Sequence, residues 1–334
     1  HVEYRRVWCP ACQQAKVEQL SFADAGQRIT HRLAHYIYEL CKVMTVEDVA
    51  RHLELNPKTV KAVDKHFLQQ EYGDTDGTGL RILAIDEIAV RKGHHYMTVV
   101  LDYETGRVVW MGEDRDKQTL DEFFAELSTD QKQAIEAVAM DMWEPYINRI
   151  QHHCPQARIV FDLFHVVKAF GQVIDRIRRD EMRKGRRQAT SYLKGSRYLL
   201  LKNPENLSSG QRIRLRDLLS TNERLNAVYI LKDQLKMIYR YRRRGWAKKA
   251  LDQWCALAAE VDHPAMDQFI KRLRFFEYGI LNHCAYAIGT SALEGVNNKI
   301  KVIKRKAYGF HDPDYFAWKV KQAIPGQKST TETG

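Results

Sequence analysis

Three acidic residues, far apart in the chain, have the chemistry of a divalent-metal site. Asp86 and Asp141 each follow an apolar run that predicts a buried strand, and Glu294 lies in a polar segment that predicts a helix. Carboxylates brought together repel one another unless a cation neutralises them. Their hard oxygens suit Mg²⁺ or Mn²⁺, and a pair of such ions supports phosphoryl transfer. Spacing alone is a weak signal, because an aspartate after a strand more often forms a turn.

An acid–histidine pair follows a later predicted strand. Asp162 and His165 form a D-x-x-H pair just after that strand. A positioned His165 could orient a scissile phosphate or a metal-bound water. A buried histidine that is hydrogen-bonded to a local carboxylate gives the same pattern, so both interpretations stay open.

The charge of the chain predicts a polyanionic partner. The 334 residues include 53 Lys plus Arg and 42 Asp plus Glu, a net charge of +11. Three basic clusters lie in residues 176–187, 240–249 and 299–306. One cluster alone could be a solvated helix face, but three favour a surface that contacts nucleic-acid phosphates.

Composition excludes several classes of protein. With 44% hydrophobic and 28% charged residues, the chain can bury a core and is not largely disordered. Six cysteines are too few for a disulfide framework. Neither a membrane-length apolar run nor a secretory signal is apparent. Because the first residue is His1, we expect a fragment of a longer chain.

The N-terminal segment carries a possible metal knuckle. Cys9 and Cys12 have the CxxC spacing that lets two thiolates hold one tetrahedral zinc ion. A closed site needs four ligands, and a second CxxC is missing. We interpret residues 1–25 as a partial zinc ribbon, with two free thiols in a loop as the alternative.

Residues 26–72 predict a helix-turn-helix DNA-binding domain. Thr45 can cap one short helix and Asn56 the next, with Pro57 at the first position of the second helix. Lys58, Thr59 and Lys61 then lie at the start of the helix that enters the major groove in this motif. An ordinary helical hairpin is the alternative.

Residues 79–165 predict the first part of a catalytic core. Apolar runs at 80–85, 95–101, 107–111, 135–140 and 158–161 predict strands, and 119–127 and 145–153 predict helices. The order β-β-β-α-β-α-β is typical of a mixed α/β sheet of ribonuclease-H type. Residues 166–288 predict a large helical insertion, after which 289–325 return to the core as a helix.

Four ordered sequence blocks resemble DDE transposases of the ISL-three insertion-sequence family, named for their Asp-Asp-Glu triad. The blocks are residues 85–87, 141–146, 161–168 and 293–301, the last continued by 307–310. The resemblance extends from about residue 7 to residue 310. It implies that Asp86, Asp141 and Glu294 are the metal-binding triad, with His165 as a further catalytic residue. The N-terminal knuckle of the family is missing, which puts zinc binding in doubt.

The resemblance further implies a metal-dependent enzyme that cuts double-stranded DNA at element ends and joins the 3′-hydroxyl to target DNA. Mg²⁺ or Mn²⁺ would be the cofactor, with Zn²⁺ in a full-length ribbon. Lys299, Lys301, Lys304 and Arg305 follow Glu294 at helical spacing and suit contacts with the DNA backbone. We expect a cytoplasmic, nucleoid-associated homodimer without membrane association.

Two other functions stay open at the level of sequence. A ribonuclease-H-like nuclease or junction resolvase would use the same metals without strand joining. A helix-turn-helix regulator would bind DNA and use the carboxylates only structurally, although acids after successive strands and a large insertion argue against it.

Overall fold

The computed structural model describes residues 5–17, 20–23, 29–91, 95–114, 116–184, 193–288, 290–307 and 311–327. By its internal contacts the chain divides into two compact units. The first comprises His1–Asp76 with Asn298–Gly326, and the second comprises Gly77–Asn297 with Gln327–Gly334. The division falls within helix α15, Thr290–Lys306.

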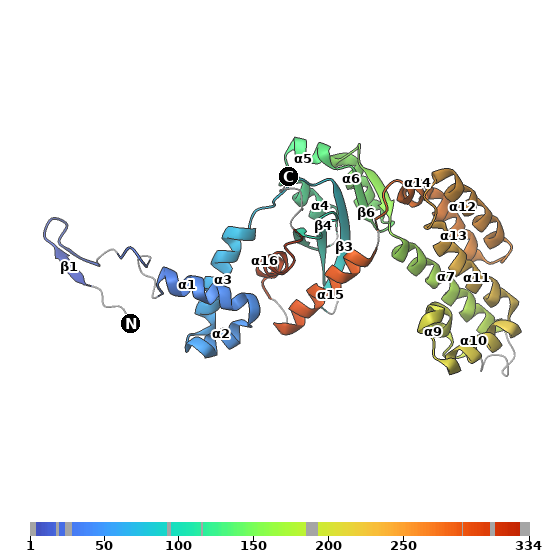
Figure 1. Ribbon diagram of the computed structural model, residues 1–334, viewed down its shortest axis with the longest axis horizontal. Helices are drawn as coiled ribbons and strands as arrows, with labels where there is room; N and C mark the ends of the chain where they lie inside the picture. Colours follow the sequence, from blue (N-terminus) through green and yellow to red (C-terminus); the bar gives the residue numbers. More distant parts are fainter. Residues whose placement is uncertain are drawn as a thin grey trace, which may run out of the picture. The chain divides into compact units, whose positions relative to one another are not determined.

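The first unit begins with a two-stranded hairpin and a three-helix domain (Figure 1). Strands β1 (Arg6–Cys9) and β2 (Gln14–Val17) pair antiparallel. Helices α1 (His31–Val43), α2 (Val46–Leu53) and α3 (Pro57–Tyr72) follow. Buried side chains from all three helices form one small core: Ile37, Cys41, Val49, Ala50 and Val60.

The turn between α2 and α3 follows the capping pattern that the sequence predicts. The Thr45 hydroxyl accepts a hydrogen bond from the backbone N–H of Asp48 at 3.1 Å, and Asn56 caps α3 through the N–H of Lys58 at 2.9 Å. Glu54 ends α2 in the left-handed conformation, with φ 56°. The predicted helix-turn-helix is confirmed as a local structure.

The C-terminal helix α16 (Pro313–Ala323) packs against α3 in the first unit. The Tyr315 hydroxyl donates to the Oδ2 of buried Asp64 at 2.5 Å, and Lys319 pairs with the same carboxylate at 3.2 Å. Residues Asn298–Gly326 cluster with the helix-turn-helix, whereas the sequence predicts 289–325 as part of the catalytic core. Periodicity predicts an apolar face on α16 but not which distant element that face packs against, so its docking on α3 could not be predicted.

The second unit contains a five-stranded mixed sheet with strand order β5-β4-β3-β6-β7. The strands are β3 (Ile82–Arg91), β4 (His95–Asp102), β5 (Val108–Glu113), β6 (Ala137–Met140) and β7 (Arg158–Phe161). The first three pair antiparallel, and β6 and β7 add parallel on the other side of β3. The predicted mixed α/β class is confirmed.

Strand β3 is longer than predicted. We expected Asp86 just after a strand, but it lies within β3, opposite Val99 of β4. The parallel ladder with β6, by contrast, stops at Ala84. Pairing with β4 therefore extends β3 beyond the last residue that pairs with β6. Asp86 is paired on the β4 side and lies beyond the paired residues on the β6 side.

Helices α4 (Lys117–Ala125), α5 (Thr129–Ala134) and α6 (Glu144–His153) connect the later strands. Helix α5 was not predicted; Ser128 and Gln131 begin it with a reciprocal capping box, which stabilises even a short helix. Leu120, Phe123 and Phe124 of α4 are fully buried in the core of the unit.

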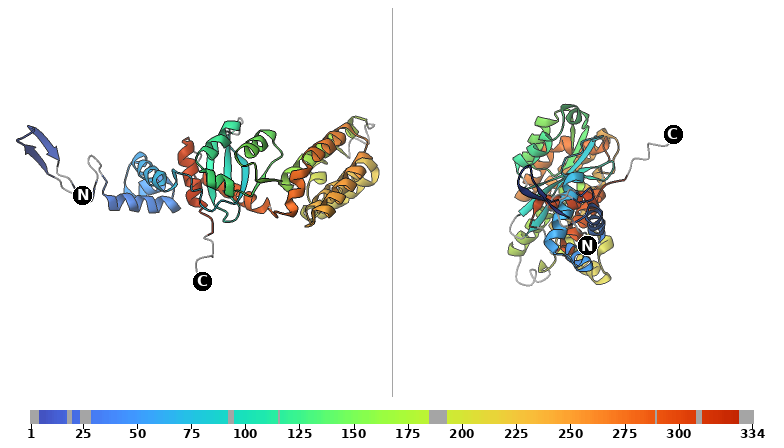
Figure 2. Two further views of the ribbon diagram at one scale, coloured as in Figure 1. Left: turned by 90° about the horizontal axis from the view of Figure 1, so that it is seen from above. Right: turned by 90° about the vertical axis from the view of Figure 1, so that its left-hand side faces the viewer.

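The described part of residues 166–288 is helical, as predicted. It comprises α7 (Leu163–Lys184), α9 (Arg197–Leu201), η1 (Pro204–Asn206), α10 (Ser209–Thr221), α11 (Glu223–Ile238), α12 (Arg244–Ala259), α13 (Pro264–Phe275), α14 (Glu277–Leu281) and η2 (Asn282–Cys284). These helices form a bundle beside the sheet, and α14 and η2 return the chain to β7 (Figures 1 and 2). Among the described residues, no helix combines the length and apolarity needed to cross a bilayer.

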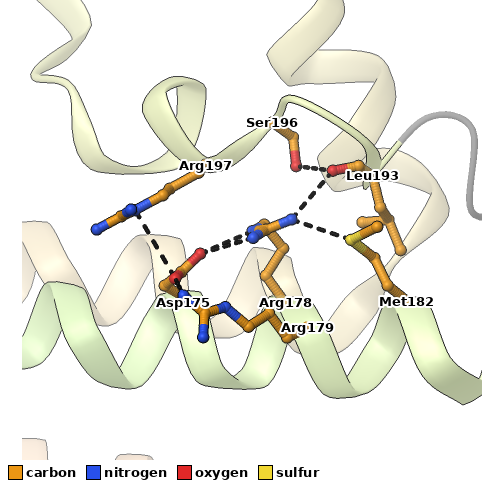
Figure 3. A network of polar contacts seen from close by, with 7 residues as sticks. All are labelled: Asp175, Arg178, Arg179, Met182, Leu193, Ser196 and Arg197. Carbon is orange, nitrogen blue, oxygen red and sulfur yellow. Dashed lines mark hydrogen bonds and ion pairs between the residues drawn. The ribbon is translucent and has the colours of Figure 1, made fainter.

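Part of the basic cluster at 176–187 is structural (Figure 3). Asp175 is buried and accepts hydrogen bonds from Arg178 and Arg179, each at 2.7 Å, while Arg197 lies 3.7 Å away. Burial by itself raises the pKa of Asp175, but the hydrogen bond from Arg178 and the three positive charges outweigh it and lower the pKa. Arg197 thus joins α9 to α7 through Asp175, and Arg178 also bonds to the carbonyl of Leu193, whereas Arg179 stays largely exposed. Arg186 and Arg187 lie outside the described residues.

Candidate active site

Three aspartates lie at one level of the sheet: Asp86 within β3, Asp141 directly after β6 and Asp162 directly after β7. The parallel ladders pair Ala84 with Ala139 and Met140 with Phe161. Extending the first ladder by two residues aligns Asp86 with Asp141. Extending the second ladder by one residue aligns Asp141 with Asp162. Adjacent strands are about 4.8 Å apart, so these carboxylates form a row. We call Asp86, Asp141 and Asp162 the aspartate row.

All three members of the row accept hydrogen bonds from nearby donors, and Asp162 accepts the backbone N–H of Phe164 on Oδ1 at 3.0 Å. Asp86 accepts the backbone N–H of Glu87 on Oδ1 at 2.7 Å and the side-chain amide of Asn297 on Oδ2 at 2.6 Å. Asp141 accepts the N–H of Met142 at 2.6 Å. These contacts orient the carboxylates without neutralising their charges.

His165 lies in the first turn of α7 and faces the row. Its Nε2 is 3.9 Å from Asp86, and its Nδ1 is 3.4 Å from Asp162. Burial lowers the pKa of His165, but Asp162 and the negative charges of Asp141 and Asp86 outweigh that effect, so the pKa is raised. The Nδ1 contact is poorly directed for a hydrogen bond, so we attribute the raised pKa mainly to the charges of the three carboxylates. The structure therefore brings His165 together with two of the predicted triad residues.

Helix α15 carries the third predicted acid. Leu293, Val296 and Ile300 are its buried positions, and Asn297 between them reaches Asp86. Glu294 lies one turn before Asn297 and is exposed. The contact of Asn297 places this part of α15 beside the aspartate row.

The donor set fits a hard divalent cation in its chemistry. Asp86 and Asp141 offer carboxylate oxygens on neighbouring strands, and a cation between them would relieve the repulsion within the row. Among the described residues, however, no group of three or more His, Cys, Asp or Glu side chains is arranged to hold a metal ion. Glu294 therefore stays a predicted ligand.

Comparison with known proteins decides the family. A family profile described as "Transposase" matches residues 83–320, and one described as "Helix-turn-helix domain of transposase family ISL3" matches residues 18–68. The chain is 43% identical over 329 residues to the transposase for insertion sequence element IS1001 of Bordetella parapertussis. That match covers 98% of this chain and 81% of the relative.

This chain belongs to the ISL3 family of transposases. A second relative, the transposase for insertion sequence element IS1557 of Mycobacterium tuberculosis (strain H37Rv), is 30% identical over 274 residues. That match covers 75% of this chain and 62% of the relative. The resemblance drawn from the four sequence blocks is thereby confirmed, although residues 308–310 of the last block lie outside the described residues.

The predicted DNA-binding residues of the transposase are mostly accessible. Lys58 and Thr59 are exposed at the start of α3, whereas Lys61 is half-buried, with its Nζ 3.9 Å from Asp312. Lys299, Lys301 and Arg305 are exposed along α15, and Lys304 is half-buried. These positions leave most of the cationic groups open to an anionic partner.

The two N-terminal cysteines lie at the tip of the β1–β2 hairpin. Cys9 ends β1 and Cys12 lies in the turn. Hydrogen bonds from Cys12 and from the backbone of Ala11 lower the pKa of Cys9, which favours the metal-binding thiolate. Within the described residues these two cysteines are not joined by enough further ligands for a closed site, so zinc binding stays a prediction.

Two residues of the candidate site are not predicted from the sequence. Asn297 follows Glu294 by three residues on one helix, a spacing that could have suggested a shared face. Tyr239, at the end of α11, donates from its hydroxyl to the carbonyl of Phe161 at 3.1 Å, directly before Asp162. Nothing in the local sequence links residues so far apart.

Proposed function

We propose that this ISL3 transposase cuts DNA at the ends of its insertion element and joins the freed 3′-hydroxyl to target DNA. The aspartate row carries the proposal, because it gathers carboxylates from three strands at one point. A ribonuclease-H-like fold is part of it, supported by the chain order of the strands and by the mixed sheet. Membership of the family supports the reaction class.

Asp86, Asp141 and Glu294 are the proposed residues that would hold Mg²⁺ or Mn²⁺. When bound, such ions would activate the attacking oxygen and stabilise the leaving oxygen. Asn297 holds Asp86 in place, and the exposed position of Glu294 leaves its carboxylate able to turn toward the row. His165 would hold the scissile phosphate by donating a hydrogen bond.

The reaction has two displacements at phosphorus and needs no covalent enzyme–DNA intermediate. Water first breaks one phosphodiester at the element end and leaves a 3′-hydroxyl and a 5′-phosphate. The 3′-hydroxyl then attacks a target phosphodiester in line and releases a new 3′-hydroxyl from the target strand. Both steps use the same carboxylates.

The proposed partner is double-stranded DNA, at element terminal repeats and at the target. Lys58, Thr59 and Lys61 would contact it from the helix-turn-helix, and the cationic side chains of α15 would hold the backbone near the site. Because two element ends must be joined, we propose a homodimer that works at the bacterial nucleoid. Cys9 and Cys12 would supply two thiolate ligands of a zinc site.

The test is metal-dependent nicking of a plasmid that carries the DNA flanking the coding gene. We expect Asp86→Asn, Asp141→Asn and Glu294→Gln each to abolish nicking in Mg²⁺, because each removes a metal ligand while keeping the shape of the side chain. Binding of the same DNA, measured by gel shift, should persist. Asp130→Asn, an exposed carboxylate on α5, is the matched control and should nick normally.

Wild-type nicking by any of the three variants would overturn the triad. A second assay offers an oligonucleotide with a pre-cut 3′ end and a plasmid target. Nicking without joining of this end would favour a nuclease or resolvase, and DNA binding without either reaction would favour a regulator.

A further inference from the structure

Residues 240–249, between α11 and α12, carry a concentrated and mostly uncompensated positive charge. The segment contains Arg240, Arg242, Arg243, Arg244, Lys248 and Lys249, all exposed, and no acidic residue. Arg244 bonds to Asn282, and Lys248 pairs with Asp252 and Glu277. The other four form no ion pair within the part of the chain that the structure describes. Such a surface is complementary to a polyanion.

Two aromatic side chains are exposed within the same segment. Trp246 is 57% exposed and Tyr241 is 40% exposed. The Nζ of Lys249 lies 5.9 Å from the centre of the Trp246 ring, so charge and ring belong to one surface. Exposed rings among cations are the combination that binds unpaired nucleotides, because the rings stack on bases while the cations hold phosphates.

The segment is fixed to the sheet beside the aspartate row. His283 contacts the backbone carbonyl of Tyr241 at 3.1 Å. Asn282 joins Arg244, at 3.0 Å, to the carbonyl of Ile159 in β7, at 2.8 Å. With the bond of Tyr239 to Phe161, these contacts tie both ends of the turn to the strand that precedes Asp162.

The separation between the segment and the row is short on the scale of DNA. The hydroxyl of Tyr239 contacts Phe161, the residue before Asp162. Tyr241 lies two residues after Tyr239. Chain geometry therefore places the backbone of Tyr241 within roughly 20 Å of Asp162. One turn of B-DNA is about 34 Å. DNA held with a phosphate at the row would reach the segment within one turn.

We propose that residues 240–249 bind the DNA strand next to the cleavage point, with phosphates on the arginines and an unpaired base stacked on Trp246. The inference rests on the proposed function, since that function places DNA at the aspartate row. DNA is favoured over a protein partner because the uncompensated charges have one sign and lie against a site with phosphate chemistry. The surface would hold an opened end in place for both displacements.

The first experiment measures binding of a fluorescently labelled forked duplex and of the fully paired duplex, by anisotropy, without divalent metal. We expect Trp246→Ala to weaken binding of the fork about tenfold, the effect of losing one stacked base. Binding of the paired duplex should change less than twofold, and Trp246→Phe should retain most of the affinity for the fork. Tyr198→Ala removes another exposed aromatic of the same bundle and should have no effect.

The second experiment tests the phosphate contacts by varying the salt concentration. Arg242→Ala should weaken both duplexes and reduce the slope of log affinity against log salt by about 0.7–0.9, the value for one lost phosphate contact. Arg216→Ala removes an exposed arginine of the same bundle and should leave the slope unchanged.

The proposal is overturned if Trp246→Ala binds the fork like the wild type, or if it loses the paired duplex equally. A changed self-association in sedimentation velocity, with DNA affinity intact, would assign the surface to a protein partner instead. The binding assay contains no divalent metal, so its outcome does not depend on nicking. Failure of the proposed triad and failure of the proposed binding surface are therefore distinguishable. Circular dichroism melting, expected to be unchanged for these exposed positions, checks folding.

Discussion

At the scale of single residues, the aspartate row is a concentration of like charge that its surroundings only partly offset. His165 faces two of the carboxylates, and its raised pKa shows the field that they create. Asn297 donates to Asp86 and adds no charge, so its effect is one of position. The carboxylates raise the pKa of His165, while Asn297 fixes the orientation of Asp86.

Asn297 is expected to be a positioning residue for Asp86. Asn297→Ala should slow metal-dependent nicking roughly tenfold, since Asp86 loses a directed hydrogen bond. Asn297→Asp should be more severe, because it replaces the donor with a negative charge in contact with Asp86. Rescue by Asn297→Gln, unchanged DNA affinity, and a melting temperature within a few degrees of the wild type would together support positioning. Equal loss in all three variants would contradict it.

At the scale of elements, the site depends on how strands and helices end. Strand β3 continues past Asp86 because β4 pairs with it, while the shorter β6 leaves Asp141 in the following loop. Helix α7 begins immediately after Asp162 and runs 22 residues into the insertion. One helix thus orients His165 and also anchors the bundle.

The left-handed end of α2 gives a clean test of the helix-turn-helix. Glu54 has φ 56° and is exposed, a conformation that costs a non-glycine residue energy. Glu54→Gly should therefore raise the free energy of unfolding of this domain by about 0.5–1 kcal/mol, as measured by urea denaturation. Glu47→Gly, placed within α2, should destabilise instead; a stabilising effect there would refute the argument.

Lys232 of α11 makes the stability of the bundle depend on pH. Its ammonium is 2% exposed and donates to the carbonyls of Leu200 and Lys202, and burial lowers its pKa to about 8. The unfolded lysine keeps its proton up to about pH 10.5, so the unfolded state binds more protons between the two values. The free energy of unfolding, relative to that of Lys232→Met, should rise with pH from 8 to 10.5, by up to about 1.4 kcal/mol per pH unit.

Chemical denaturation across that pH range checks the sign. A flat difference between the wild type and Lys232→Met over this interval would show that the folded lysine keeps its proton as the unfolded one does.

At the scale of the whole molecule, the two ends of the sequence build one unit. Helix α16 contributes Tyr315 to a cluster with Tyr38 and Leu68, and it meets the buried Asp64 with a hydroxyl and an ammonium. Asp64 would be costly to bury without these partners. The helix-turn-helix domain is therefore completed by residues that lie beyond the catalytic region in the chain.

Tyr315→Phe should destabilise the first unit. The substitution keeps the ring but leaves Asp64 with one fewer donor, at a cost of about 1–3 kcal/mol. Hydrogen exchange of α3 amides should speed up accordingly, while amides of the β3–β7 sheet keep their protection. Tyr198→Phe, at an exposed position, is the control. Unchanged exchange in α3 would show that the Tyr315–Asp64 bond adds nothing to stability.

Much of the local structure is encoded in short stretches of sequence. Thr45, Asn56 and Pro57 predict the ends of α2 and α3, and the apolar runs predict the five strands of the sheet, because capping and alternation act between near neighbours. Strand register determines the aspartate row. It could not be predicted, since register depends on pairing between distant segments.

By itself, the sequence determined the family, the helix-turn-helix and the mixed α/β class, and it predicted which acids form the candidate site. Only the tertiary structure decided that Asp162 stands level with Asp86 and Asp141, that Asn297 holds Asp86, and that α16 belongs with α3. The physical reason is the range of the interactions: caps and periodicity act within a few residues, whereas these contacts join segments about 20 to 250 residues apart, and only packing of the whole chain selects them.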